Sequence, residues 1–483
     1  MTGDPNEPPR PLPDAEDEAD RWATPQPNLT GRGIIAGYSG RFWMLTIVLG
    51  VITGGAAAAL LGLLHLVERL AYGSRSTTFL ATVRAAPGWR HFAALLVAAV
   101  VVIVGLRVLG RLPLSGGTEV SESLWLRRGR MAFVPSIARC VLSIVTVGLG
   151  VSLGREAAPQ LAGAATASKL ADWAALPLWQ RRLLVASGAG AGLGAVYNVP
   201  LGGTLFALEV LLGTVALPLV LPALLTSVTA TAVAWIALGT GPTYVVPTYN
   251  VHASQLVWAA LMGPVIGLVA VAWARLITLA TRLRQPSGPG RYVIPVAVFA
   301  ALAALSLPYP QLLGNGKDIV ALAVVGKVSI GLLAVLFVLK PIVTAACISS
   351  ESPGGLFTPT FAIGVLLAGL VGSAWSHLWP GAAAGSYALI GGGAFLAAAM
   401  QGPLSGTVLV LELARHFDAL IVPTLLAVAE ATIVARRFGA LSIYSARVGS
   451  EPGGVKPPTG SAMATLYALD EALPADLELD DCK

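Results

Sequence analysis

Gly154-Arg155-Glu156 is the segment of this sequence whose residue types and position point most directly to chemistry. It opens an apolar segment directly after another long hydrophobic stretch, so Glu156 is expected in the first turn of a helix that begins inside the membrane. Free N–H groups and the positive end of the helix dipole favour an anion there. The carboxylate is therefore predicted to occupy an anion site or to be displaced by an anion. The alternative is a glutamate that only caps its own helix.

A second opening of the same design lies about 200 residues later. Gly354-Gly355-Leu356-Phe357 leads through Thr358-Pro359 into another apolar segment. Glycines let the backbone approach a ligand closely, and consecutive N–H groups at a helix start can hold an anion without a charged side chain. Two such helix starts can point at one ion. A third opening places Ser115 beside Gly116 and, taken alone, is typical of an ordinary turn.

Composition indicates the environment in which these helices must lie. Of the 483 residues, 55% are hydrophobic and only 12% are charged, and the mean hydropathy is +0.75. Soluble globular proteins carry about 25% charged residues, so an ordinary soluble enzyme is excluded. Between the two acidic tails the chain has 27 basic and 11 acidic side chains. This basic body suits an anionic substrate, and it equally suits Arg and Lys anchors in cytoplasmic loops.

The apolar segments predict an all-α polytopic membrane protein with two inverted structural repeats and with broken and re-entrant helices. Many segments are interrupted by Gly or Pro, or have lengths unlike the ~20 residues of a simple spanning helix. We expect a disordered acidic, Pro-rich tail over 1–29, a transmembrane domain over 30–448 and an acidic tail over 449–483. The repeat halves are expected at about 40–240 and 250–448.

An internal repeat supports this division. When residues 188–209 are shifted by 203 positions, eleven of twenty-two are identical to those at 391–412, and Pro-Leu-x-Gly-Thr followed by an apolar run and Glu occurs in both copies. Duplicated halves with discontinuous helices are typical of secondary transporters. The glutamates that end the two copies, Glu209 and Glu412, are interpreted as structural polar anchors rather than as proton relays.

Other classes of function find little support. Cys140, Cys347 and Cys482 lie far apart and the five histidines are dispersed, so neither a metal site nor a cofactor is predicted, and no nucleophile with a base or phosphate-binding loop indicates an enzyme. No cleavable signal peptide is recognised. A secondary transporter for another anion or a small organic solute stays open as the alternative.

The three openings and Tyr444, in their order along the chain, resemble the anion pathway of the CLC family of chloride channels and chloride/proton exchangers. The similarity covers about residues 40 to 448, and the most specific match is Ser352 to Pro359. In that family Gly-Ser-Gly-Ile-Pro, Gly-(Lys or Arg)-Glu-Gly-Pro and Gly-x-Phe-x-Pro segments and a tyrosine near the C-terminus line the pathway. This sequence departs from the pattern at Gly117 and Thr118, and at Ala157 and Ala158.

The resemblance implies roles for individual residues. Ser115 and Tyr444 would donate hydroxyls to a central chloride, whose other partners are the N–H groups of Leu356 and Phe357. Glu156 would be the gating glutamate, which fills an anion site when ionised and swings away when protonated. The remaining anion-binding residues implied by the resemblance are Gly116, Arg155 and Gly355.

The resemblance also implies partners and location. The family's coupled exchangers usually carry a second, proton-relaying glutamate where this chain has Val210, so coupling to protons is left open. Chloride is the expected substrate, with bromide or nitrate as further candidates, and no nucleic acid is expected. A homodimer in the lipid of the plasma membrane is implied, without C-terminal CBS domains. The positions of Arg and Lys favour cytoplasmic termini.

Overall fold

The computed structural model describes residues 38–73, 78–111, 119–284, 288–415 and 420–448. The predicted tails, 1–29 and 449–483, lie outside the described residues, as do Ser115 and Gly116. The chain divides into two units, Met1–Met44 and Leu45–Lys483. In the first unit, the ring of Tyr38 stacks on that of Phe42 with centroids 4.8 Å apart. The second unit contains every residue of the site described below.

All regular elements among the described residues are helical, as predicted. In chain order they are α3 (Gly40–Tyr72), α4 (Phe79–Ala85), α5 (Gly88–Leu109), α6 (Val120–Leu126), α7 (Phe133–Gly148), α8 (Ala157–Trp173), α9 (Leu178–Tyr197), α10 (Pro200–Leu205), the π-helix η1 (Phe206–Leu211), α11 (Leu217–Leu238), α12 (Ala253–Arg282), α13 (Gly290–Ser306), the short 3₁₀ helix η2 (Pro310–Leu312), α14 (Lys317–Ala323), α15 (Ile330–Ser349), α16 (Phe357–Leu378), α17 (Ala384–Met400), α18 (Pro403–Ala414), α19 (Ile421–Arg437) and α20 (Ser445–Val448).

The lengths of these helices agree with a membrane protein whose helices are partly broken. Within the described residues six helices are long and apolar enough to cross a membrane, namely α3, α5, α11, α12, α15 and α16. Several other apolar helices have 10–17 residues, among them α7, α13, α17 and α18. A spanning helix needs about 20 residues, and these helices are shorter than that.

The two copies of the sequence repeat break at the same point. Asn198 ends α9 in the left-handed conformation at φ 58°, and Pro200 begins α10 two residues later. Gln401, which is 203 positions further on, follows α17 at φ 60°, and Pro403 begins α18. A left-handed residue satisfies the last carbonyls of a helix, and proline is tolerated at the first position of the next. The Asn/Gln and Pro positions therefore determine where each long apolar segment divides.

Small residues allow the helices around the site to pack closely. α8 packs along α9, and α16 along α17. At Gly163 and Gly188 the backbones of α8 and α9 meet directly, because a Cβ added to either glycine would overlap backbone atoms of the other. Close backbone approach of this kind is characteristic of helix packing in membranes. It brings the first turn of α8 near the end of α9.

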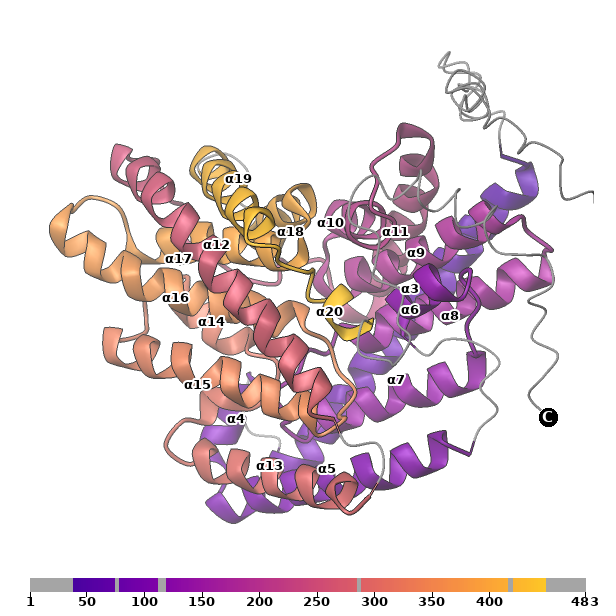
Figure 1. Ribbon diagram of the computed structural model, residues 1–483, viewed down its shortest axis with the longest axis horizontal. Coiled ribbons are helices and arrows are strands. Elements are labelled where there is room, and N and C mark those ends of the chain that lie inside the picture. The colour runs from indigo at the N-terminus through magenta and orange to yellow at the C-terminus, as the bar shows by residue number, and fades with distance from the viewer. Residues whose placement is uncertain (1–37, 74–77, 112–118, 285–287, 416–419, 449–483) are drawn as a thin grey trace, which may run out of the picture. The chain divides into compact units, whose positions relative to one another are not determined.

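The short helix α20 returns the end of the described chain to the site. It packs beside α6 and α12 (Figure 1). The backbone N–H of Ile443 donates to the carbonyl of Ala399 in α17 at 3.0 Å. Tyr444, directly before α20, is thereby brought close to the N-terminal part of the chain.

Candidate anion site

Glu156 is almost completely buried, with 1% of its surface exposed. It stands at the N-cap of α8, yet its side chain makes no capping hydrogen bond to that helix. Its Oε1 instead accepts from the backbone N–H of Phe357 at 2.9 Å and of Thr358 at 3.4 Å. The interpretation of Glu156 as a cap of its own helix is therefore wrong. The carboxylate lies at the start of α16, where the dipole and free N–H groups favour a negative charge.

Two glycines bring these helix starts together. Gly154 and Gly355 form an isolated antiparallel bridge, in which each N–H donates to the other's carbonyl at 2.7 Å. A Cβ built on either glycine would overlap the carboxylate of Glu156. Both positions therefore need glycine, since the backbone passes directly against the charged group. The prediction that two glycine-rich openings converge on one site agrees with this geometry.

Two hydroxyl groups complete the surroundings of the carboxylate. Tyr197 Oη donates to Glu156 Oε2 at 2.9 Å, and Thr358 Oγ1 donates to the same oxygen at 3.1 Å. The two hydroxyls also contact each other. Neither residue was among those predicted. The motif that contains Thr358 gave a usable signal for it, whereas Tyr197 reaches the site from the far end of a glycine-rich helix and no spacing links it to Glu156.

Arg155, the residue before Glu156, lines the larger of the two cavities near the carboxylate. Its side chain is 8% exposed, and its guanidinium lies over the ring of Tyr197, 5.3 Å from the centroid. The Nε atom is buried without a hydrogen-bond partner. This larger cavity has a volume of about 560 Å³. The ionisable residues that line it are His65, Glu68, Arg69, Arg155, Lys317 and Asp318.

Lys317 begins α14, which is not one of the membrane-length helices. Burial lowers the pKa of its ammonium group to about 8, and nearby Arg155 adds to this effect, whereas Asp318 and Glu68 oppose it. Asp318 has a structural contact as well, since its Oδ2 accepts from the N–H of Leu80 at 2.6 Å and thus binds the first turn of α4. The net charge of this cavity therefore changes near physiological pH.

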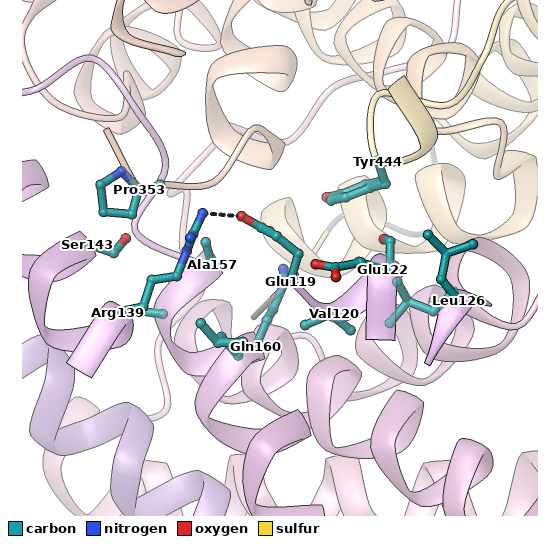
Figure 2. Close-up of a pocket in the computed structure, with 15 residues that line it drawn as sticks. Glu119, Val120, Glu122, Leu126, Arg139, Ser143, Ala157, Gln160, Pro353 and Tyr444 are labelled. Atoms are coloured by element: carbon teal, nitrogen blue, oxygen red, sulfur yellow. Dashed lines mark hydrogen bonds and ion pairs between the residues drawn. The ribbon is translucent and has the colours of Figure 1, made fainter. Parts of the chain in front are cut away.

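A smaller cavity of about 120 Å³ is lined by Ala157, the residue that follows Glu156 in the sequence. Figure 2 shows Ala157 and Tyr444 on its wall, together with the ion pair between Arg139 and Glu119, whose Nη2 and Oε1 are 2.5 Å apart. Gln160 also lines it, and its buried Nε2 has no hydrogen-bond partner. Arg155 lines the larger cavity and Ala157 the smaller one, and Glu156 is the residue between them in the sequence.

The residues singled out in the sequence thus fall into three groups. Arg155, Glu156, Gly355, Leu356 and Phe357 meet at the paired helix starts. Tyr444 lines the smaller cavity, as do Ala157 and Gly354, and its ring packs against that of Phe206 with centroids 5.3 Å apart. The third group, Ser115 and Gly116, is outside the described residues.

The repeat glutamates connect the two halves of the chain. The carboxylate of Glu412 accepts from the N–H of Leu201 at 3.2 Å and of Gly202 at 2.6 Å, at the start of α10. The carboxylate of Glu209 accepts from the N–H of Leu404 at 3.1 Å and of Ser405 at 2.6 Å, at the start of α18. Their interpretation as structural anchors is confirmed. Val210, beside Glu209, is buried.

Comparison with known proteins decides the family. Residues 102–436 match the family model of the voltage-gated chloride channel. The chain belongs to this family. It is 31% identical over 382 residues to a ClcB-like chloride channel protein of Ralstonia nicotianae, a match that covers 76% of this chain and 87% of the relative. It is 32% identical over 310 residues to the H⁺/Cl⁻ exchange transporter ClcA of Salmonella arizonae, covering 62% of this chain and 65% of that protein.

Solved structures show the same fold. A slow cyanobacterial Cl⁻/H⁺ antiporter superposes with a TM-score of 0.74 at 20% identity, covering 84% of this chain and 97% of that one. A CLC-type fluoride/proton antiporter superposes with a TM-score of 0.68 at 19% identity, covering 86% and 99%. Membership of the voltage-gated chloride channel family makes this chain a multi-pass membrane transport protein rather than an enzyme, and supports chloride transport as its function.

Proposed function

We propose that this protein moves chloride through a pathway that the Glu156 carboxylate opens and closes. The observation that carries the proposal is the position of this carboxylate on the N–H groups of Phe357 and Thr358. An ionised carboxylate there occupies the place of an anion. Protonation removes the charge that holds it, and a chloride ion can then take the same donors. Flux is therefore expected to rise as pH falls.

The two cavities supply the remainder of the proposed pathway. Chloride enters the larger cavity past Arg155 and Lys317, and it passes the smaller cavity beside Tyr444. We propose Tyr444 and Ser115 as hydroxyl ligands of a central chloride, together with the N–H groups of Leu356 and Phe357, as the resemblance to the family implies. Gly355 gives the backbone the close approach that such a site requires, and we propose the same role for Gly116.

The site is better suited to a small monovalent anion than to an organic solute. The carboxylate of Glu156 is in contact with backbone N–H groups and two hydroxyls in a fully buried position. An organic substrate would need a roomier site with varied polar side chains. We propose chloride as the main substrate, with bromide and nitrate as further anions.

The assembly and orientation are part of the same proposal. Two copies form a homodimer in the plasma membrane, each with its own pathway, and both termini lie in the cytoplasm. Arg436 and Arg437 at the end of α19 support this orientation. Crosslinking in native membranes and protease accessibility of tagged termini test the two statements separately.

The decisive experiment records chloride efflux and external pH together from chloride-loaded liposomes, with the membrane potential set by a potassium ionophore. In Glu156→Gln we expect chloride flux to persist without the rise at low pH and without linked proton movement. Asp172→Asn, at an ion-paired surface carboxylate on α8, is the matched control and should behave as wild type. Normal pH dependence in Glu156→Gln would contradict the proposal.

The wild-type protein in this assay also resolves the question of coupling. Protons driven uphill by the chloride gradient would identify an exchanger that operates with valine at position 210. Chloride flux without proton movement would identify a channel or an uncoupled carrier, as expected if a carboxylate at that position is required for proton entry.

A further inference from the structure

The carboxylate of Glu156 marks two neighbouring positions for negative charge. Its Oε1 lies on the backbone N–H groups at the start of α16. Its Oε2 lies on two side-chain hydroxyls, at 2.9 Å from Tyr197 Oη and 3.1 Å from Thr358 Oγ1. All three side chains are buried, each with no more than 1% of its surface exposed. The second position therefore has two side-chain donors, which belong to this chain's own sequence.

Building on the function proposed above, we propose that Tyr197 and Thr358 bind the permeating anion at this second position when Glu156 withdraws, and that they determine its anion selectivity. Both residues are then specificity-determining ligands of the transported ion.

The donor count supports this assignment. An ionised carboxylate is acceptor-only, so both hydroxyls donate their single proton to Oε2. When the carboxylate leaves, the hydroxyls can satisfy only one donor by bonding to each other. Leaving the other donor buried and unpaired is unfavourable. An anion at the position of Oε2 accepts from both and removes this cost.

The orientation of Tyr197 is fixed by its neighbours. Its ring packs against Phe357 with centroids 5.5 Å apart, and the guanidinium of Arg155 covers its face. Its carbonyl accepts from Thr243 Oγ1 at 2.6 Å. The hydroxyl is therefore held in place toward the site with or without the carboxylate.

The chemistry of the two hydroxyls indicates which anions they favour. Hydrogen-bond donors replace the hydration shell of an ion, and the gain is larger for a small, strongly hydrated anion than for a large, weakly hydrated one. Loss of either hydroxyl should therefore weaken the binding of chloride more than the binding of thiocyanate. Besides Glu156, the ionisable side chains that interact with Tyr197 are Arg155 and Tyr244, and both are retained in the variants below.

The test measures chloride binding by calorimetry in Glu156→Ala, which leaves the site free of its carboxylate. Tyr197→Phe or Thr358→Val is added to this background. Each should weaken chloride binding by about tenfold, the equivalent of one hydrogen bond to a charged group. Each should also lower the ratio of chloride to thiocyanate flux in liposomes. Thr358→Ser keeps the hydroxyl and should restore both properties.

Thr360→Val is the matched control on the same helix, because Thr360 Oγ1 is buried and accepts from Trp273 Nε1 at 3.0 Å, away from Glu156. It should change neither chloride binding nor selectivity. Unchanged affinity and flux ratio in both Tyr197→Phe and Thr358→Val would overturn the inference. If Glu156→Ala itself bound and passed no chloride, the proposed function would fail instead, so the two failures are distinguishable.

Discussion

Gly154 and Gly355 donate a backbone hydrogen bond to each other, and both N···O distances are 2.7 Å. The two glycines are 201 positions apart and lie in different halves of the chain. Their bridge places the loop that carries Glu156 directly against the start of α16. The position of the carboxylate thus depends on contact between the two halves, and not on α8 alone.

Replacement of Gly355 by alanine should displace Glu156. The added Cβ would overlap Oε1 of the carboxylate, so the side chain must leave the N–H groups that hold it. We expect Gly355→Ala to lose the rise in flux at low pH, as predicted for Glu156→Gln, and to carry chloride more slowly, because the same Cβ crowds the position of the anion. The liposome assay over pH 5 to 8 measures this. The control is Gly62→Ala in α3, where a Cβ meets no neighbouring atom. A pH response like that of wild type in Gly355→Ala would refute the expectation.

The charge of Lys317 should give the flux a second pH dependence. With a pKa of about 8, the ammonium group is protonated below pH 8 and loses its charge as pH rises toward 9. Chloride in the larger cavity then loses an attraction of about 1 kcal/mol, the Coulomb energy of two charges 4 Å apart in water. Flux should therefore fall several-fold between pH 7 and 9.

This second dependence is measured in Glu156→Gln, where the response of the gate is absent. Adding Lys317→Gln should give low flux that no longer changes over this pH range. Lys327→Gln, at an exposed lysine, should leave the dependence intact. A pH response that survived Lys317→Gln would assign it to another group.

The glutamates of the repeat should contribute measurably to stability. Glu412→Ala leaves the N–H groups of Leu201 and Gly202 without their acceptor, and the loss of a helix cap costs about 0.5–2 kcal/mol. Glu209→Ala should cost a similar amount. Thermal unfolding in detergent measures both changes, and Glu122→Ala serves as the comparison because its pair with Arg127 is partly exposed and such pairs contribute about 0–1 kcal/mol. Equal unfolding temperatures for all three variants would be inconsistent with capping.

Close packing of α8 and α9 should make Gly188 sensitive to a single methyl group. In Gly188→Ala the new Cβ meets the backbone of Gly163, so the helices must separate, at a cost of about 1–3 kcal/mol for overpacking. Thermal unfolding should occur at a lower temperature than in wild type. Gly331→Ala, where a Cβ meets no neighbouring atom, should not show this decrease, and an unchanged unfolding temperature in Gly188→Ala would mean that the interface can expand without cost.

The sequence predicted those parts of the site that depend on local structure. A glycine followed by a helix start identifies free N–H groups wherever it occurs, so Glu156 and Phe357 could be recognised directly. Tyr197 could not, because its contribution depends on how α9 packs on α8 and on the position where Asn198 ends the helix. The role of Glu156 was open for a similar reason. Its carboxylate accepts from N–H groups in the other half of the chain, and the spacing of residues around Glu156 does not reveal that contact.

The repeat shows the same limit. A shift of 203 residues identified Glu209 and Glu412 as equivalent, and the cost of a carboxylate in an apolar segment indicated that each has a partner. Equivalence does not reveal which helix each one contacts. That information comes only from the packing of α10 against α18.

The exchange of caps between Glu209 and Glu412 has a consequence for how such a chain can arise. Because each glutamate completes the helix of the other repeat, the contact has the form of an isologous interface, in which the same surface is used twice about a two-fold axis. A half-length protein with this sequence could satisfy its own helix start only by associating with a second copy. Fusion of two such copies would join partners that already bind each other, and a contact of the kind seen between Glu209 and Glu412 would then lie inside a single polypeptide.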